Sequence, residues 1–317
     1  MRVVFMGTPD FAVYTLEAII GAGHEVVAVV TQPDKPKGRG KTLAFTPVKE
    51  VAVREEIPVL QPVRIKEEGV YEQLASYAPD VIVVVAYGQI IPESILNLPR
   101  FGCINVHASL LPAYRGAAPI QWAVINGEKE SGVTTMYMAK GLDTGDMIDK
   151  VVVPLAEDET GGSLHDRLAA AGAELLLGTL TKLENGTAVR TPQKEEESSY
   201  AHMLTKQLGN IDWTKPATSI EHLIRGLNPW PSAYTRLDNK TLKIWNAKVI
   251  TEKDFESVNP DAVCGQVVYV DKKHFIIKTG MDYLAVEELQ LEGKKRMLTD
   301  AFLRGYKLTT ETILGMK

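Results

Sequence analysis

The first half of the chain alternates between short apolar runs and amphipathic stretches, separated by turn residues. Apolar runs bounded by Gly and Pro predict buried strands, and apolar positions three or four residues apart predict helices packed on a sheet. This alternation is typical of an open, mostly parallel, doubly wound α/β sheet. The predicted strands are 2–7, 24–32, 57–60, 80–88 and 101–107, and the predicted helices are 10–23, 46–56, about 68–78 and about 117–126.

Further along the chain the pattern changes to strands without a helix between them, and then to one long helix. Two strand-like runs, 132–139 and 146–155, are joined by the short loop KGLDTG and predict an antiparallel addition to the sheet. A long helix is predicted at 163–183. The polar segment 191–206 is low in apolar residues, so an exposed connector is expected there.

The last part of the chain consists of short apolar runs separated by turn residues, after a helix predicted near 216–227. Several short strands with turns between them predict a small β-barrel of the OB-like kind. We therefore expect a doubly wound domain over 1–190, a linker over 191–206 and a C-terminal β-barrel over 207–317. The predicted barrel strands are 233–237, 240–250, 265–270, 274–279 and 282–291.

The composition excludes several classes of protein. Of the 317 residues, 45% are hydrophobic and 24% charged, as in ordinary globular proteins. The apolar run 81–91 is too short to span a bilayer and the first residues lack a secretory pattern, so a cytoplasmic protein without membrane contact is expected. Cys103 and Cys264 are far apart and are expected to be reduced thiols. No CxxC or HExxH spacing predicts a metal site.

Charge divides the chain unevenly, although the net charge of −5 by itself argues against nucleic-acid binding. Residues 205–317 contain 17 Lys and Arg against 14 Asp and Glu, a net +3. Residues 1–204 then contain 18 against 26, a net −8. Such asymmetry can mark a module that faces nucleic acid, but scattered solvated charges explain it equally well. Charge alone leaves both interpretations open.

The sequence contains neither GxGxxG, the motif for dinucleotide binding, nor GxxxxGK[ST], the P-loop motif for binding nucleotide phosphates. These two common uses of a doubly wound sheet therefore lose support. Instead, Asn105 and His107 stand at the end of a predicted strand, where period-two alternation points both side chains to one face. Ligands of such sheets bind at the carboxyl ends of strands. A carboxamide and an imidazole could there hold an oxygen that becomes anionic during acyl transfer, and the imidazole could move a proton. A structural role for a buried histidine is the alternative.

A third group is needed to orient the histidine. Asp143, in the loop KGLDTGDM, is the first candidate and Asp146 the second, although either could be a turn residue in a Gly-rich loop. Ser109 could be a nucleophile, but it fits a turn or a ligand contact better because no serine or cysteine lies in a GxSxG context. In acyl transfer, the substrate would therefore have to supply the nucleophile.

A long loop at 32–49 contains the cations Lys35, Lys37, Arg39 and Lys41, with glycines on both sides of Arg39. Cations on a flexible, glycine-flanked loop fit contact with phosphate, either of a nucleotide or of a polynucleotide backbone. A solvated surface loop is the alternative, although loops of this length are uncommon unless they are functional or disordered.

The stretch NVHASLLPAYRGAAP and the downstream GLDTGDM together resemble the formyltetrahydrofolate-using transferases. The pattern of that family has Asn-x-His-x-Ser-Leu-Leu-Pro followed by Leu-Asp-Thr-Gly-Asp, and both parts are intact here. Three further stretches, VVFMGTPDFAV, QPDKPKGRGK and GLNPWPSAYT, are similar to the branch of the family that formylates methionyl-tRNA. The resemblance covers essentially the whole chain.

This resemblance implies a one-carbon transferase that moves the formyl group of 10-formyltetrahydrofolate to the α-amine of initiator methionyl-tRNA, for translation initiation and without a metal. It implies that Asn105 and His107 stabilise the oxyanion, while Asp143 orients His107 and helps to deprotonate the amine. The residues that would contact the folate are Tyr87, Gly88, Gln89, Ile90, Ser109, Leu110, Leu111 and Pro112.

The same resemblance assigns tRNA binding to two parts of a chain expected to be a monomer. Lys37, Arg39 and Lys41 would contact the acceptor end, and the basic C-terminal barrel would add backbone affinity. A formyltransferase for a sugar nucleotide or small ribonucleotide is one alternative, against which the barrel and the Gly-Arg-Gly-Lys loop weigh. A non-catalytic folate- or RNA-binding protein is the other, against which the intact catalytic pattern weighs.

Overall fold

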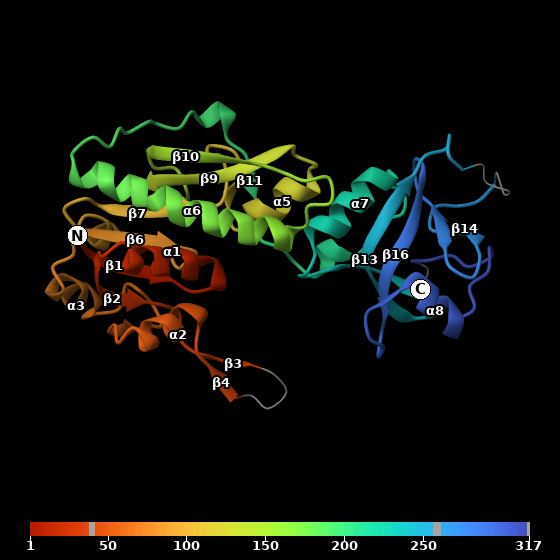
Figure 1. The fold of residues 1–317 in the computed structure, drawn as a ribbon, viewed down its shortest axis with the longest axis horizontal. Helices are drawn as coiled ribbons and strands as arrows, with labels where there is room; N and C mark the ends of the chain where they lie inside the picture. The colour runs from red at the N-terminus through yellow and green to blue at the C-terminus, as the bar shows by residue number, and fades with distance from the viewer. Residues whose placement is uncertain (38–41, 256–260, 316–317) are drawn as a thin grey trace. The chain divides into compact units, whose positions relative to one another are not determined.

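The computed structural model describes residues 1–37, 42–255 and 261–315, and the chain divides into two compact units (Figure 1). The N-terminal unit consists of Met1–Pro119, Glu130–Pro154 and His165–Ala201. The C-terminal unit consists of Ile120–Lys129, Leu155–Leu164 and His202–Lys317. Two short segments that precede residue 165 thus belong to the C-terminal unit. In the described part of the chain, no helix is long and apolar enough to cross a membrane.

The N-terminal unit is built on a seven-stranded sheet of order β10-β9-β7-β6-β1-β2-β5. Five strands are parallel, and β9 and β10 add antiparallel strands at one edge, so the predicted doubly wound sheet with an antiparallel addition is confirmed. The sheet strands are β1 (Arg2–Gly7), β2 (Glu25–Val30), β5 (Val59–Leu60), β6 (Val81–Val85), β7 (Cys103–His107), β9 (Glu130–Tyr137) and β10 (Met147–Pro154). The helices between them are α1 (Asp10–Gly21), α2 (Pro47–Arg54), α3 (Val70–Ser76) and α4 (Glu93–Leu96), and α6 (Gly161–Glu184) follows the last strand.

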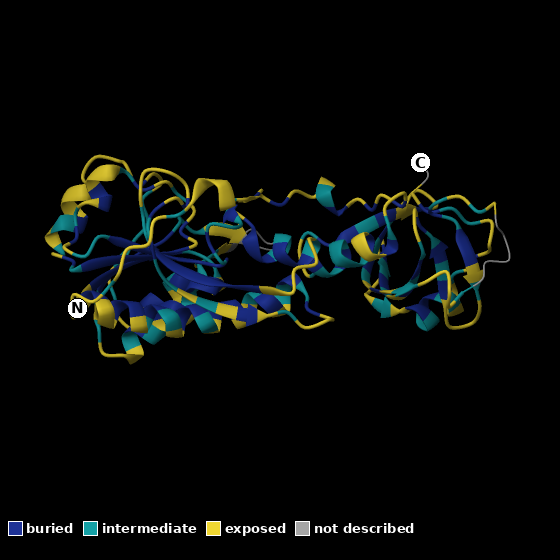
Figure 2. Cartoon of the chain, turned by 90° about the horizontal axis from the view of Figure 1, so that it is seen from above, coloured by how far each residue is buried: buried dark blue, intermediate teal, exposed yellow. Residues whose placement is uncertain are grey.

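Both faces of this sheet are buried, because its central strands are apolar on both sides (Figure 2). On one face, Val4 and Ile82 pack in a cluster with Leu74 of α3 and Ile95 of α4. On the other face lie α1 and α6. Helix α6 approaches β7 and β9 so closely at Gly172 that an added Cβ would lie 3.0 Å from a methyl group of Val106.

Sequence signals explain where helix α2 begins. Helix α2 begins where predicted: the Thr46 hydroxyl accepts a hydrogen bond from the Lys49 N–H at 3.2 Å, and Pro47 stands at the first helical position. The loop predicted at 32–49 is wrong in part, because β3 (Lys35–Lys37) and β4 (Thr42–Ala44) form a short hairpin there. Strand pairing uses backbone groups, so a basic sequence does not prevent it.

The segment at 191–206, expected to be an exposed connector, has structure of its own. Its Thr191 exchanges two backbone hydrogen bonds of 2.9 Å with Met147 of β10. After the short 3-10 helix η1 (Glu195–Glu197), β11 (Tyr200–Ala201) pairs in parallel with β8 (Arg115–Gly116). The part up to Ala201 therefore belongs to the N-terminal unit.

The C-terminal unit contains an antiparallel sheet of order β12-β13-β16-β15-β14, with β17 paired to β16. This confirms the predicted change to a C-terminal domain of antiparallel strands, and helix α7 packs on β13. Its core includes Trp213, Phe275 and Phe302. The elements are α5 (Pro119–Ile125), η2 (Gln207–Gly209), α7 (Ala217–Gly226), β12 (Ala233–Leu237), β13 (Lys240–Ile250), β14 (Val267–Val270), β15 (Phe275–Lys278), β16 (Tyr283–Leu291), β17 (Met297–Leu298) and α8 (Thr299–Gly305).

Candidate active site

Strand β7 carries Asn105 and His107 to the carboxyl end of the parallel strands. Asn105 pairs with Val84 of β6, and His107 pairs with Thr134 of β9. Both polar side chains are buried, with exposed fractions of 9% and 7%. They alternate with Val106, which faces α6, so the predicted shared face is confirmed.

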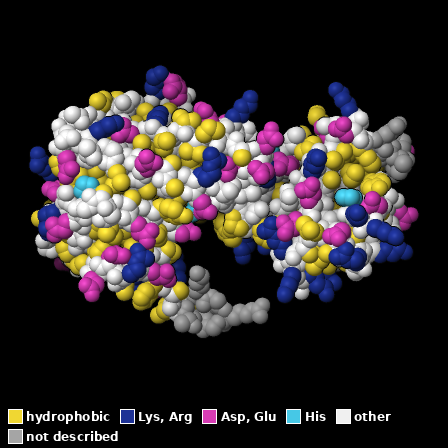
Figure 3. All heavy atoms as spheres, in the orientation of Figure 1, with side chains coloured by type: hydrophobic (Ala, Val, Ile, Leu, Met, Phe, Trp, Pro, Cys, Tyr) yellow, Lys and Arg dark blue, Asp and Glu magenta, His cyan; other side chains and the backbone are white. Residues whose placement is uncertain are grey.

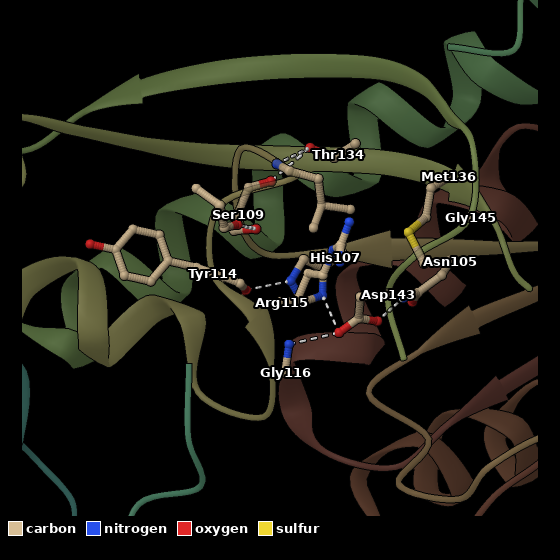
Figure 4. Close-up of polar contacts among 12 residues, drawn as sticks. Asn105, His107, Ser109, Tyr114, Arg115, Gly116, Thr134, Met136, Asp143 and Gly145 are labelled. Carbon is tan, nitrogen blue, oxygen red and sulfur yellow. Dashed lines mark hydrogen bonds and ion pairs between the residues drawn. The ribbon is translucent and has the colours of Figure 1, made fainter. Parts of the chain in front are cut away.

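Asp143 reaches this pair from the loop between β9 and β10 (Figure 4). Its Oδ1 accepts a hydrogen bond from Asn105 Nδ2 at 3.5 Å, and its Oδ2 lies 3.7 Å from His107 Nδ1. The Gly116 N–H donates to the same Oδ2 at 2.8 Å. Because Asp143 is only 8% exposed, the structure brings a carboxamide, an imidazole and a carboxylate together in one buried cluster.

The other nitrogen of the His107 ring is held by the backbone. Nε2 lies 2.9 Å from the carbonyl oxygen of Tyr114, and because a carbonyl can only accept, Nε2 donates to it. Nδ1 then faces the Asp143 carboxylate, so groups from two loops orient the ring. Asp146, the second candidate for this role, lies instead against Arg190, with 3.8 Å between its Oδ2 and Nη1.

The segment 109–112 follows β7 and is anchored to the two antiparallel strands. The Thr134 hydroxyl donates to the Ser109 carbonyl at 2.7 Å and accepts from the Leu111 N–H at 3.1 Å, and Lys150 Nζ donates to the Leu111 carbonyl. Burial lowers the pKa of Lys150. The Ser109 hydroxyl donates to the Ala113 carbonyl at 2.7 Å, as expected of a turn residue rather than a nucleophile. The partly buried members of the segment are Leu110 and Pro112.

The segment 87–90 follows β6, the strand next to β7, so both segments implied to contact folate leave neighbouring strands at the same edge. Tyr87 is buried, its hydroxyl has no hydrogen-bond partner among the described residues, and burial raises its pKa to about 12. Gly88 has a φ of +87°. The Gln89 side chain accepts from the Ile65 N–H at 2.7 Å, and Ile90 is 85% exposed.

Of the three residues expected to contact tRNA, the structure describes one. Arg39 and Lys41 fall outside the described residues, and Lys37 is the last residue of β3. At the base of the hairpin, Lys49 Nζ lies 2.5 Å from Asp34 Oδ2. This hydrogen bond to Lys49 is the largest cause of a lowered pKa at Asp34.

Sequence reasoning missed several groups that touch the cluster. The Tyr114 carbonyl and the Gly116 N–H contribute through the backbone, which carries no side-chain signal. Gln193 also reaches the Asp143 loop, where its Nε2 donates to the Asp143 carbonyl at 2.7 Å. Because Gln193 stands 50 residues away in the chain, no local pattern could have indicated this contact. Among the described residues, no group of three or more His, Cys, Asp and Glu could hold a metal ion.

Two family models match the sequence. The model described as formyl transferase matches residues 1–180, and the one described as the C-terminal domain of formyl transferase matches 203–307. The chain belongs to the formyl transferase family. As a formyl transferase it is a one-carbon transferase, and its co-substrate is 10-formyltetrahydrofolate.

Curated formyl transferases resemble this chain over its full length. A protein of Agathobacter rectalis is 60% identical over 96% of both chains, and one of Lachnospira eligens is 59% identical over 99% of this chain and 100% of its own. Both are named methionyl-tRNA formyltransferase. The fold also resembles an N-formyltransferase from Helicobacter canadensis, solved with folinic acid and dTDP-3-aminofucose. That structure has a TM-score of 0.64 at 18% identity and covers 94% of this chain and 100% of its own.

Proposed function

We propose that this formyl transferase moves the formyl group of 10-formyltetrahydrofolate to the α-amine of initiator methionyl-tRNA, at the start of translation. The observation that carries the proposal is the buried contact of Asp143 with both Asn105 and His107. The full-length relatives named for methionyl-tRNA support the choice of acceptor.

The reaction needs no nucleophile from the protein. The neutral α-amine of the methionyl ester attacks the formyl carbon, and a tetrahedral intermediate with an anionic oxygen forms. The bond from that carbon to N10 of the folate then breaks, the amine loses a proton, and N10 gains one. An unperturbed α-amine has a pKa of about 7.7–8.0, so much of it is already neutral near physiological pH.

Each member of the buried cluster has a proposed role in these steps. The Asn105 carboxamide and the His107 imidazole stabilise the oxyanion, which is the largest single contribution in many acyl transfers. The Asp143 carboxylate orients His107 and takes up the amine proton, through water where the distance requires it. The segments 87–90 and 109–112 hold the folate through backbone polar groups and apolar side chains.

The proposed division of labour assigns catalysis to 1–190 and tRNA binding to 207–317, joined through 191–206. Lys37, Arg39 and Lys41 would contact the acceptor end of the tRNA. Lys and Arg side chains are numerous on the C-terminal unit, as Figure 3 shows for one face, and would bind the phosphate backbone. A monomer in the cytoplasm fits this function.

The test measures formyl transfer to initiator tRNA charged with methionine, to methionine methyl ester and to a sugar-nucleotide amine. We expect a strong preference for the charged tRNA and loss of that preference in Arg39→Ala. Arg39→Lys, which keeps the charge, is the matched control. Preferred transfer to the sugar-nucleotide amine would overturn the proposed acceptor, and no transfer to any amine would overturn the catalytic role.

A further inference from the structure

The segment that follows α6 runs against the loop that contains Asp143. Thr191 pairs with Met147 at the start of β10, and two residues later Gln193 turns its side chain toward the loop. Gln193 Nε2 donates to the Asp143 carbonyl at 2.7 Å and to the Gly145 carbonyl at 2.8 Å. One amide group thus holds the loop at two points on either side of Thr144.

The other end of the same amide is bound by a buried arginine. Gln193 Oε1 accepts a hydrogen bond from Arg115 Nε at 3.0 Å, and Arg115 is only 4% exposed. Arg115 Nη1 also lies 2.8 Å from Glu195 Oε2, whose side chain is 81% exposed. Both ends of the Gln193 amide are therefore engaged, and the arginine fixes which end points at the loop.

Arg115 belongs to a tripeptide that touches the catalytic cluster directly. The Tyr114 carbonyl accepts from His107, and the Gly116 N–H donates to the Asp143 carboxylate (Figure 4). The tripeptide binds the Asp143 carboxylate through the Gly116 N–H. Gln193, held by Arg115 of the same tripeptide, binds the Asp143 backbone. The link closes a ring of contacts around Asp143, with its side chain held from one side and its carbonyl from the other.

Asp143 needs such support because its backbone conformation is unfavourable. Its φ of +54° lies in the left-handed region, which is less favourable than ordinary backbone for every non-glycine residue, although aspartate tolerates it better than most. Its neighbour Gly145 packs against the Tyr137 carbonyl, so the loop has little room to shift on that side. A small displacement of the loop would move the carboxylate away from Asn105 and His107, which lie at distances of 3.5 and 3.7 Å.

We propose that Gln193 is a positioning residue for formyl transfer, which holds Asp143 in its active geometry by binding the Asp143 and Gly145 carbonyls while Arg115 fixes the amide. This inference rests on the proposed function, in which the Asp143 carboxylate orients His107 and takes up the amine proton. Because the Gln193 amide is bound to Arg115 and to the Asp143 and Gly145 carbonyls, its replacement should act on the rate of transfer and leave binding of both substrates nearly intact.

The test replaces Gln193 with Glu and with Leu in the full-length protein. Gln193→Glu keeps an acceptor for Arg115 but puts a carboxylate oxygen against the two carbonyls, and Gln193→Leu keeps similar bulk without polar groups. We expect both variants to lower the single-turnover rate by about 10- to 100-fold, the usual scale for slight misplacement of a catalytic group. The KM values for folate and charged tRNA should change by less than about threefold. Glu195→Gln, which alters the exposed partner of Arg115, is the matched control and should retain the wild-type rate.

A double-mutant cycle separates positioning from a general loss of structure. If Gln193 acts through Asp143, Gln193→Leu should lower the rate strongly in the wild-type background and hardly at all in Asp143→Asn. An equal loss of rate in the wild-type and Asp143→Asn backgrounds, or an unchanged rate in both Gln193 variants, would overturn the proposal. Should Gln193→Glu fail to fold, the cycle with Gln193→Leu decides alone.

The wild-type acceptor assay keeps this outcome distinct from failure of the proposed function. If wild-type protein prefers a small amine over methionyl-tRNA, the proposed acceptor is wrong, and the Gln193 variants are then assayed with that amine. If the wild-type protein transfers formyl to methionyl-tRNA at full rate and the cycle is additive, the function stands and the role of Gln193 is overturned.

Discussion

Asn105 and His107 are polar side chains that a central strand buries, and burial of polar groups costs free energy unless they find hydrogen-bond partners. The structure supplies those partners from two loops, the Asp143 carboxylate and the Tyr114 carbonyl. A satisfied histidine is compatible with a purely structural role. Membership of the formyl transferase family, whose model matches residues 1–180, is what favours catalysis.

Replacement of His107 tests the catalytic role of the imidazole. We expect His107→Ala to lower the rate of formyl transfer by at least about 100-fold, the usual cost of losing a donor to an oxyanion. Affinity for the charged tRNA should stay nearly unchanged, because the side chain is buried. Single-turnover kinetics and tRNA-binding measurements provide the check. A weak effect on rate, or a large loss of tRNA binding, would remove His107 from this role.

Tyr87 gives a prediction for high pH. Burial raises its pKa from 10.0 to about 12, so the folded protein keeps the hydroxyl neutral at pH values where the unfolded chain ionises it. The resulting stability is fully present below about pH 10 and is lost as the pH rises through about 12. Between pH 10 and 12, the free energy of unfolding should therefore fall less for Tyr87→Phe than for the wild-type protein.

Urea unfolding of both proteins at pH 8, 10 and 11.5 measures this difference. At pH 8 the Phe variant should be at least as stable as wild type, because the hydroxyl it removes has no partner among the described residues. Identical pH dependence of the two proteins would show that the hydroxyl is not shielded from solvent in the folded state.

At the scale of elements, the loop between β9 and β10 does most to shape the site. Gly145 lies so close to the preceding strand that an added Cβ would stand 1.8 Å from the Tyr137 carbonyl oxygen. A backbone oxygen in a paired strand cannot move aside as a flexible side chain can. The glycine therefore permits the tight turn that brings Asp143 back over the sheet.

Two glycine-to-alanine substitutions test this account of the loop, because we expect them to change the free energy of unfolding in opposite directions. Gly145→Ala should destabilise the fold by about 1–3 kcal/mol, the cost of overpacking, and lower the rate of transfer. Gly178 lies within α6, and an added Cβ there meets nothing within 4 Å. Gly178→Ala should therefore raise the free energy of unfolding by about 0.5–1 kcal/mol and leave activity unchanged. Urea unfolding and transfer assays check both, and equal stability of the two variants would contradict the proposed role of Gly145.

At the scale of the whole molecule, charge differs between the two parts of the chain. The turn after β16 contains three consecutive cations, Lys294, Lys295 and Arg296, and all three are exposed. Arg296 also pairs with Glu288 on the neighbouring strand. The two lysines are therefore the better candidates for binding phosphate.

We expect the KM for charged tRNA to rise steeply with salt, while the KM for methionine methyl ester, which has no phosphate, stays nearly constant. Lys294→Ala with Lys295→Ala should raise the KM for tRNA and reduce the slope of log KM against log salt by about 1 for each phosphate that the protein no longer binds. The matched control replaces both lysines with Arg and should keep the slope. An unchanged slope in the Ala variant would show that the tRNA binds to another part of the protein.

Local patterns in the sequence were sufficient to predict the order of the main elements, the parallel sheet with its antiparallel edge, and the shared face of Asn105 and His107. These features follow from periodicity, which each strand or helix carries within its own residues. The same patterns ranked Asp143 ahead of Asp146 as the residue that orients His107. They missed the β3–β4 hairpin, whose pairing depends on backbone hydrogen bonds that basic side chains neither require nor prevent.

Features that depend on contacts between distant parts of the chain emerged only from the folded structure. The fold placed the Tyr114 carbonyl against His107, and it brought Gln193 to the Asp143 loop from 50 residues away. Such contacts arise when loops from different strands meet at one sheet edge, and no periodic pattern in either segment records the meeting. The polar residues that bear the chemistry could therefore be named from the sequence, but the groups that hold them in place could not.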